Sequence, residues 1–320
     1  MTVKKNPLLI HRREHAEALL EKYDNFLFDC DGVIWLDEKI IEGVKDTLEF
    51  LKKNGKKFAF VTNNSSKSRQ EYLAKFSSLG IQGVTKDHIF PTCYAAVQAL
   101  ESDLQVPKKS KIWVLGDSGI EDELEEAGYI PVGGTDARLN QAFRADHEFL
   151  TVDPEVQAVV VGSTKEFNYM RIASTLQYLL WKNKTIPFIG CNIDRSYPGP
   201  NGLILPAGGS VVNYMQYTAD RDFINVGKPS KVFLEAILAK NGFDRSRTLM
   251  VGDTLYTDIK FGNDGQLGEG CGSLLVLTGG TTPEYLHQFL QNPNHYDEGE
   301  SMIPSYVIRS LGDFVDIIQS

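Results

Sequence analysis

The chain has 320 residues and a formal net charge of -9, and 42% of its residues are hydrophobic and 23% charged. This length favours two domains, and the composition is that of a folded protein with substantial cores. The negative charge argues against a nucleic-acid partner held through its phosphates, and no apolar run approaches the roughly 18 residues of a membrane-spanning helix.

The N-terminal segment and the cysteines bear on where the protein works. Its basic residues are not followed by a long apolar core and a cleavage site, so we expect no signal peptide. The four cysteines are scattered without metal-finger spacing, which fits reduced thiols. We therefore expect a cytoplasmic protein, with the nucleus also open, that binds neither nucleic acid nor membranes.

The first strand ends in two acids. After a short helix predicted over residues 9–22, the apolar run Phe26-Leu27-Phe28 indicates a buried strand that ends at Asp29, and Gly32 then lets the chain turn. Ligands bind at this end of strands in open α/β sheets. Asp29 and Asp31 repel each other unless a cation is near. Taken alone, such a pair is more often a polar turn than a metal site with an aspartate nucleophile.

The next elements predict a parallel sheet. Apolar residues recur at helical spacing from residue 44 to 51, and the run 58–61 indicates a second buried strand. That strand ends in Thr62-Asn63-Asn64-Ser65-Ser66, a polar cluster that suits either a helix N-cap or a bound phosphate. A helix follows over residues 72–79. Strands alternating with helices imply parallel pairing through right-handed crossovers.

A second strand–helix series predicts an inserted domain. After a helix over residues 94–100, strands are expected at 112–115, 156–161 and 186–189, with a helix at 169–180. Residues 191–209 are rich in Pro, Gly and Asn and are expected to form a long loop or a chain crossing, before a helix at 211–217. We therefore predict an inserted domain over residues 109–222, and a first domain made of residues 1–108 and 223–320.

The first domain then resumes. Lys228 lies in a loop before a predicted helix, and the strand 248–251 is followed by Asp253 and, five residues later, Asp258. Another buried strand is expected at 274–277, a final edge strand at 306–307 and a covering helix at the C-terminus. A lysine in such a loop, or a Gly-Asp after a strand, is by itself usually a feature of the turn.

Together, the polar residues at the strand ends indicate a site for phosphoryl transfer. They are Asp29, Asp31, Thr62, Asn63, Lys228, Asp253 and Asp258. All lie at predicted strand ends or next to one. Carboxylate oxygens suit Mg²⁺, which usually binds few carboxylates together with waters and substrate phosphate. The hydroxyl of Thr62 and the charge of Lys228 suit phosphoryl oxygens.

The chain resembles the haloacid dehalogenase superfamily of phosphatases over nearly its whole length. The matching segments are 29–33, 61–65, 227–230 and 251–254 with Asp258, and segments 192–194 and 206–210 are similar to the cap signature of the p-nitrophenylphosphatase, phosphoglycolate phosphatase and pyridoxal phosphatase group. The resemblance implies an α/β fold, with a Rossmann-like, doubly wound parallel-sheet core and an inserted α/β cap.

The resemblance also implies a role for each residue of the site. Asp29 is the nucleophile and Asp31 the general acid and base. Mg²⁺ is bound by Asp29, the backbone carbonyl of Asp31 and Asp253, with Asp258 in support. The phosphate-binding residues are Thr62, Asn63, Asn64 and Lys228.

The function implied is a Mg²⁺-dependent phosphomonoester hydrolase that forms an aspartyl phosphate. Its expected substrates are small phosphometabolites such as 2-phosphoglycolate, and p-nitrophenyl phosphate as an artificial one. One alternative is a pyridoxal phosphate phosphatase, and another is a phosphotransferase or phosphomutase with the same chemistry. A non-catalytic binding protein on this fold usually lacks a catalytic acid, and none is lost here. A receiver-type phosphoacceptor needs no insertion of this size.

The cap is expected to choose the substrate. Within its loop, Asp194 would shape the backbone, Arg195 would meet a substrate carboxylate and Tyr197 would pack on the substrate, although Arg195 is as readily a solvated loop cation. Thr164 stands where the family commonly has Asp, which affects cap contacts rather than chemistry. Members of the group often dimerise through the cap, so a homodimer is compatible with the resemblance.

Two further residues near the first motif are expected to be structural. Cys30 stands beside the nucleophile and could be sensitive to oxidation, but a small buried residue is the expected reading. Trp35 is expected to pack at the junction of the two domains rather than to take part in catalysis.

Overall fold

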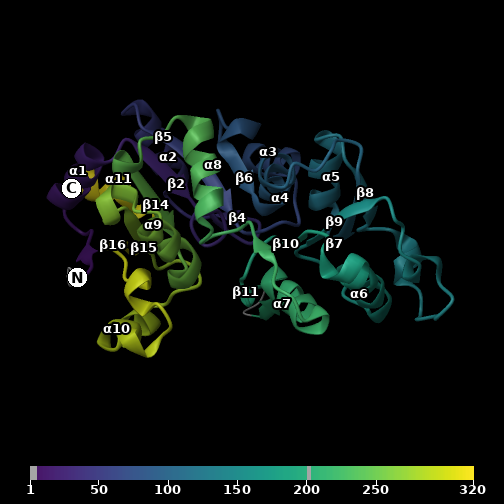
Figure 1. Ribbon diagram of the computed structural model, residues 1–320. Helices are drawn as coiled ribbons and strands as arrows, with labels where there is room; N and C mark the ends of the chain where they lie inside the picture. Colours follow the sequence, from purple (N-terminus) through teal and green to yellow (C-terminus); the bar gives the residue numbers. More distant parts are fainter. Residues whose placement is uncertain (1–5, 200–202) are drawn as a thin grey trace.

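Two parallel sheets, joined by helices, organise the computed structural model in Figure 1, which describes residues 6–199 and 203–320. The first sheet has seven strands among the described residues, and the second has five. In spatial order, the first sheet contains β1 (Leu8–Leu9), β16 (Tyr306–Ile308), β15 (Ser273–Val276), β14 (Thr248–Gly252), β2 (Asn25–Phe28), β5 (Lys57–Thr62) and β6 (Ile89–Pro91). The second contains β13 (Ile224–Asn225), β10 (Phe188–Gly190), β9 (Val156–Val161), β7 (Lys111–Leu115) and β8 (Ile130–Gly133).

Helices cover both sheets, and two small hairpins complete the fold. The hairpins are β3 (Trp35–Leu36) with β4 (Lys39–Ile40), and β11 (Ser196–Pro198) with β12 (Ile204–Pro206). The α-helices are α1 (Arg13–Lys22), α2 (Val44–Lys53), α3 (Arg69–Ser78), α4 (Thr92–Gln98), α5 (Ser118–Glu126), α6 (Tyr169–Lys184), α7 (Gly208–Ala219), α8 (Lys231–Asn241), α9 (Lys260–Asp264), α10 (Pro283–Gln291) and α11 (Asp313–Gln319). Residues 99–103 and 255–259 form single π-helical segments.

The central strands are short apolar runs because both of their faces are buried. In β2, Phe26 and Phe28 point to one face of the sheet, where they pack with residues of α1, α2, α3 and α11. Leu27 points to the other face and packs with residues of α4 and α8. This alternation makes the first sheet doubly wound, as the sequence predicted.

One hydrophobic cluster extends across both sheets. It joins Leu27 and Val61 of the first sheet to Val114 and Val160 of the second, with residues of α4 and α5 between them. The opposite face of the second sheet packs against α6 and α7 in a cluster of its own. The two sheets are therefore connected by buried apolar surface as well as by chain crossings, and Figure 1 shows α4 and α5 between them.

The structure corrects three expectations about the elements. The N-terminal helix begins at Arg13 rather than at residue 9, because residues 8–9 form β1. Residues 306–308 are not an edge strand, because β1 pairs with their outer side. The expected loop at 191–209 contains the hairpin of β11 and β12. Strands of two or three residues carry too little periodicity to be predicted from sequence.

The division into a first domain and an inserted cap stays a proposal. Its first boundary, at residue 109, falls between the two sheets, but residue 222 falls within the second sheet, because β13 of that sheet lies just after it. The chain therefore returns to the seven-stranded sheet only after Asn225. Among the described residues, no helix combines the length and the apolar character needed to cross a membrane.

Candidate active site

Three carboxylates meet at the carboxyl ends of two neighbouring strands. Asp29 follows β2 and Asp253 follows β14, and these strands pair side by side, with Phe28 opposite Val251. Asp258 comes from the π-helical segment that begins two residues after Asp253. One carboxylate oxygen from each residue lies within 4.8 Å of the other two, and all three residues are buried.

Close packing fixes the positions of two of these acids. Both Asp253 and Thr254 donate their backbone N–H groups to Asp258 Oδ2, at 3.1 and 3.0 Å. Asp253 Oδ2 accepts the backbone N–H of Gly280 at 2.5 Å. Gly32 has a φ of +84°, and a Cβ there would lie 2.5 Å from Asp253 Oδ2, so only glycine fits this turn.

Lys228 places a buried cation among the carboxylates. The residue is 1% exposed, and its Nζ lies 2.5 Å from Asp29 Oδ1 and 2.7 Å from Asp258 Oδ1. The same ammonium donates to the carbonyl of Val61 at 2.8 Å. The lysine thus links β5 to the acidic cluster through two hydrogen bonds and an ion pair.

The charges of the cluster are not balanced by Lys228 alone. Burial raises the pKa of Asp29 well above its ordinary value against the opposing effect of Lys228, and burial, followed by the charge of Asp258, raises the pKa of Asp253 to about 8. Burial opposes the charge of Lys228, but Asp258 and Asp29 together raise its pKa. Three carboxylates facing one ammonium, with only oxygen donors, fit a divalent cation with a preference for hard ligands.

Asp31 lies at the open side of the site. Its backbone bridges to Trp35, and its exposed carboxylate accepts a hydrogen bond from Trp35 Nε1 at 2.8 Å. Trp35 itself is fully buried against Tyr72 and Phe76 in the cluster on the α2–α3 face of the first sheet. The expected position of Trp35 at the domain junction is therefore wrong, and its contact with Asp31 had not been predicted.

The predicted phosphate-binding residues follow β5. Asn63 Oδ1 accepts the backbone N–H of Lys228 at 2.8 Å, and Asn63 Nδ2 donates to the carbonyl of Lys228 at 3.2 Å. Thr62 is buried at the end of the strand, and its hydroxyl accepts the N–H of Asn64 at 3.1 Å. The side chain of Asn64 accepts from Ser66, so it stabilises the loop itself. The geometry brings Asn63 to Lys228, whereas the hydroxyl of Thr62 is engaged with Asn64 and Tyr72, and the side chain of Asn64 with Ser66.

One of the three predicted cap residues reaches the cluster. Asp194 is near Lys228 and Asp258, and its pKa is raised by burial, while hydrogen bonds from Asn63 and Tyr256 oppose the shift. Arg195 is exposed, its backbone contacts Tyr256, and its charge is close to Tyr285 of α10. Tyr197 lies two residues after Arg195, in the hairpin strand β11, and its side chain is exposed.

Several positions near the site had no predicted role, or a minor one. Asn192 donates from Nδ2 to the carbonyl of Asn63 at 2.7 Å, and the sequence marked Asn192 only as part of the cap signature. Thr164 lies in the turn after β9, where its hydroxyl accepts the N–H of Glu166. Cys30 is fully buried, and burial raises the pKa of its thiol, so the prediction that this residue is buried is confirmed.

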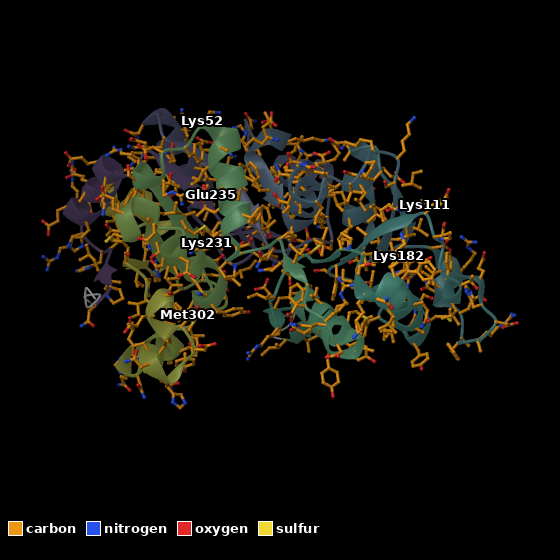
Figure 2. The ribbon with its side chains drawn as sticks, in the orientation of Figure 1. Lys52, Lys111, Lys182, Lys231, Glu235 and Met302 are labelled. Atoms are coloured by element: carbon orange, nitrogen blue, oxygen red, sulfur yellow. The ribbon has the colours of Figure 1, made fainter. Side chains whose placement is uncertain are left out.

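Removal of the buried cation should be costly. We expect Lys228→Met to lower the unfolding free energy of the metal-free protein by about 3–5 kcal/mol, because two buried carboxylates lose their counter-ion. Urea unfolding followed by circular dichroism measures this loss. Lys231→Met is the matched control, since Lys231 is exposed at the start of α8 (Figure 2). Equal stability of the two variants would contradict the assigned ion pairs.

A doubly wound parallel sheet, with carboxylates and a lysine at the ends of its strands, defines the class of α/β enzymes that handle phosphoryl groups. Sequence models described as "Haloacid dehalogenase-like hydrolase" match residues 26–130 and 119–265, and one described as "HAD-hyrolase-like" matches residues 225–313.

Relatives match along nearly the whole chain. The 4-nitrophenylphosphatase of Schizosaccharomyces pombe is 36% identical, covering 95% of this chain and 97% of its own. Phosphoglycolate phosphatase 2 of Arabidopsis thaliana is 37% identical, covering 95% of this chain and 96% of its own. The solved structure of a p-nitrophenyl phosphatase from Archaeoglobus fulgidus has a TM-score of 0.73 at 29% identity, over 92% of this chain and 99% of that chain. The chain belongs to the haloacid dehalogenase-like hydrolases, and it is a phosphatase, as the sequence predicted.

Proposed function

We propose that the chain is a Mg²⁺-dependent phosphomonoester hydrolase that forms an aspartyl phosphate on Asp29 and acts on small phosphometabolites. The observation that carries the proposal is the buried Asp29 carboxylate, 2.5 Å from the Lys228 ammonium and clustered with two further acids. Asp29, Asp253, Asp258 and the backbone carbonyl of Asp31 would hold the metal. When bound, Mg²⁺ would supply positive charge for the phosphoryl oxygens and keep Asp29 ionised.

The chain's own residues then divide the reaction into two steps. Asp29 attacks phosphorus, the bond from phosphorus to the ester oxygen breaks, and Asp31 gives its proton to the leaving alcohol. Asp31 next takes a proton from water, which attacks phosphorus and releases phosphate from Asp29. The exposed position of Asp31 supports this role, because the leaving group and water must both reach it. Thr62 and Lys228 would hold the phosphoryl oxygens in line.

A phosphate-release screen tests the reaction class. Purified protein would be assayed with 2-phosphoglycolate, pyridoxal phosphate, p-nitrophenyl phosphate and other small phosphomonoesters, each with and without Mg²⁺. An added alcohol acceptor separates hydrolysis from phosphotransfer, since transfer would give a new phosphoester instead of free phosphate. Metal-dependent release of free phosphate supports the proposal, and transfer that exceeds release would favour the phosphotransferase or phosphomutase reading.

We propose 2-phosphoglycolate-like acids as substrates because the loop above the cluster carries a cation. Asp194 is hydrogen-bonded to Asn63 and Tyr256 and is near Lys228, and the next residue, Arg195, is exposed. The Arg195 guanidinium could meet a carboxylate on the leaving group, whereas Tyr197 in the hairpin would contact only larger substrates. The name of the matching Arabidopsis enzyme agrees with a substrate of this kind.

Substitution of the loop arginine tests this selectivity. We expect Arg195→Ala to lower kcat/KM for 2-phosphoglycolate by one to two decades, since a lost charge-assisted hydrogen bond costs about 1.5–3 kcal/mol. The matched substrate is 2-hydroxyethyl phosphate, in which an alcohol replaces the carboxylate, and its kcat/KM should change only a few-fold. Arg144→Ala is the control variant, because Arg144 is an exposed arginine paired with Asp146. Equal losses on both substrates would assign Arg195 to folding or domain packing instead.

We also propose how the protein assembles and where it works. A homodimer through the cap is supported by α7, on which Tyr214 and Tyr217 are 44% and 90% exposed, because aromatic side chains are enriched at interfaces. A cytoplasmic location is supported by the four unpaired cysteines, three of them buried.

A further inference from the structure

The loop between β5 and α3 is held from outside by the second sheet. This segment, called here the loop 62–68, comprises the last residue of β5 and the loop proper, and it carries the proposed phosphate ligands Thr62, Asn63 and Asn64. Three of its groups bond to residues from beyond position 109. Those bonds run from Asn192 Nδ2 to the carbonyl of Asn63 at 2.7 Å, from the N–H of Ser163 to Ser65 Oγ at 2.8 Å, and from the N–H of Gly119 to the carbonyl of Ser66 at 3.2 Å. The seven-stranded sheet alone therefore does not fix the loop's shape.

Glu123 of α5 makes a fourth contact, at the start of α3. The first turn of a helix leaves backbone N–H groups without partners inside the helix. Ser68 and Glu71 satisfy two of these groups in a capping box. Glu123 Oε1 accepts another, the N–H of Arg69, at 2.7 Å. Glu123, which lies 54 residues after Arg69 in the sequence, thus caps the N-terminus of α3.

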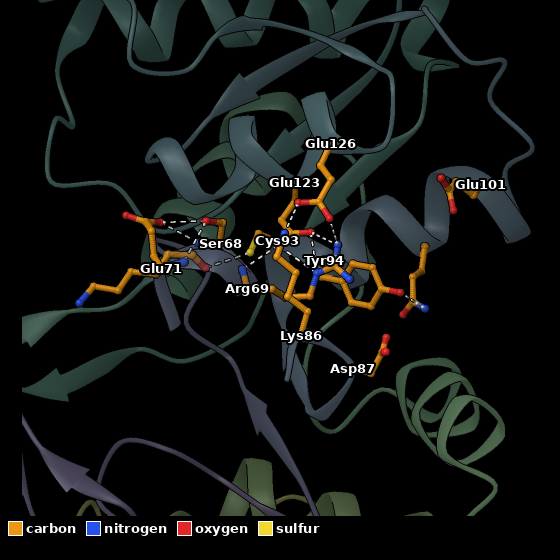
Figure 3. Close-up of polar contacts among 12 residues, drawn as sticks. Ser68, Arg69, Glu71, Lys86, Asp87, Cys93, Tyr94, Glu101, Glu123 and Glu126 are labelled. Atoms are coloured by element: carbon orange, nitrogen blue, oxygen red, sulfur yellow. Dashed lines mark hydrogen bonds and ion pairs between the residues drawn. The ribbon is translucent and has the colours of Figure 1, made fainter. Parts of the chain in front are cut away.

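The same carboxylate binds the side chain of Arg69. Both of its oxygens accept from Arg69 Nε, at 3.1 and 2.9 Å, and Oε2 lies 2.8 Å from Nη2. The guanidinium packs on the ring of Tyr94, with 3.7 Å between its central carbon and the ring centroid. Glu123 is only 1% exposed, so its contacts with Arg69 are shielded from water. Figure 3 shows Arg69, Tyr94 and Glu123 together.

A second acid of α5 provides a natural comparison. Glu126 lies one turn away from Glu123, pairs with Arg69 Nη2 at 3.2 Å and with Lys86 at 2.8 Å, and is 48% exposed in its side chain. Among the described residues, Glu126 bonds to the side chains of Arg69 and Lys86 and not to the backbone of α3 or of the loop. The two acids therefore share the arginine, but only Glu123 holds the helix start.

Close packing prevents α5 from sliding on the loop. A Cβ at Gly119 would lie 2.5 Å from the backbone carbonyl carbon of Lys67, so α5 already touches the loop backbone there. The loop in turn fixes the backbone of Lys228, because the side-chain amide of Asn63 is hydrogen-bonded to both the N–H and the carbonyl of that lysine. A shift of α5 would consequently reach Thr62, Asn63 and Lys228, while Asp253 and Asp258 stand on β14 and its following turn.

We infer that Glu123 is a positioning residue for phosphate binding: paired with Arg69, it fixes the loop 62–68 against the second sheet. This inference rests on the proposed function, since it assigns phosphate binding to that loop. It separates two parts of one site. Phosphate binding at this loop depends on Glu123, whereas the metal-binding acids Asp253 and Asp258 are held by backbone N–H groups of Asp253, Thr254 and Gly280.

The test compares Glu123→Gln with Glu126→Gln in the full-length protein. Glutamine keeps the size of the side chain and removes its charge. For Glu123→Gln we expect kcat to fall about tenfold and the inhibition constant of inorganic phosphate to rise about tenfold, as for a lost charge-assisted hydrogen bond. The Mg²⁺ concentration for half-maximal activity should stay within about twofold in both variants, and Glu126→Gln should change none of these constants appreciably.

Further measurements keep the inference separate from the proposed function. Phosphate binding to each variant, measured by calorimetry, needs no turnover, so it still decides the inference if the wild type proves inactive on every substrate tested. Arg69→Lys serves as a milder second variant, because it keeps the charge and the backbone N–H and loses the paired geometry; we expect a smaller loss of phosphate affinity from it. A lower melting temperature for Glu123→Gln with unchanged kcat and phosphate affinity would make Glu123 merely structural and overturn the inference.

Discussion

Asp29→Asn should abolish phosphate release while leaving the fold intact. The amide is nearly isosteric with the carboxylate but cannot form the acyl phosphate, so kcat should fall by at least about 10⁴-fold, as is usual when a covalent nucleophile is removed. Stability should not suffer, because burial already raises the pKa of Asp29 and disfavours its charge. The metal-free variant should therefore melt at the wild-type temperature or above it.

The control for this substitution lies at the opposite end of the same strand. Asp24 precedes β2 and pairs with Lys56 and Arg247, away from the site, so Asp24→Asn should keep turnover within about twofold. Acid-quenched wild type, digested and analysed by mass spectrometry, should carry a phosphoryl group on the peptide that contains Asp29. Turnover of p-nitrophenyl phosphate by Asp29→Asn at a tenth of the normal rate would remove Asp29 from the nucleophile's role.

Local patterns in the sequence predicted the central strands and the acids that follow them. Short apolar runs such as Phe26-Leu27-Phe28 have to be buried on both faces, and polar residues at their ends must lie at one edge of a parallel sheet. The sequence alone thus predicted Asp29, Asp253 and Asp258 at one edge of the sheet, and the structure brings them together.

Contacts between distant segments could not be predicted in this way. The cap that Glu123 provides for α3 comes from an element 54 residues later along the chain. The sequence also gave no sign that β1 would cover β16. Each of these contacts depends on tertiary packing, for which hydrophobic periodicity carries no signal.

The charge of the acidic cluster makes a strong prediction about metal removal. Asp29, Asp253 and Asp258 are buried within 4.8 Å of one another and face a single buried ammonium, that of Lys228. A divalent cation would offset the remaining repulsion and should therefore stabilise the fold as well as permit turnover. The two effects can be measured separately, which keeps the metal assignment independent of any one substrate.

Chelation with EDTA should reduce phosphate release to background, and added Mg²⁺ should restore it. Mg²⁺ at about 100 times its dissociation constant should stabilise the fold by about 2.7 kcal/mol, which a thermal melt detects.

Ca²⁺ should raise the melting temperature but inhibit turnover. Its coordination geometry is less strict than that of Mg²⁺, so Ca²⁺ can bind both oxygens of Asp29 and leave neither free to attack phosphorus. Asp253→Asn should lose activity and metal-dependent stabilisation together, whereas Asp264→Asn, which changes a partly buried ion pair with Lys260, should keep both. Full activity after exhaustive chelation, or an unchanged melting temperature with Mg²⁺, would contradict a metal at these three carboxylates.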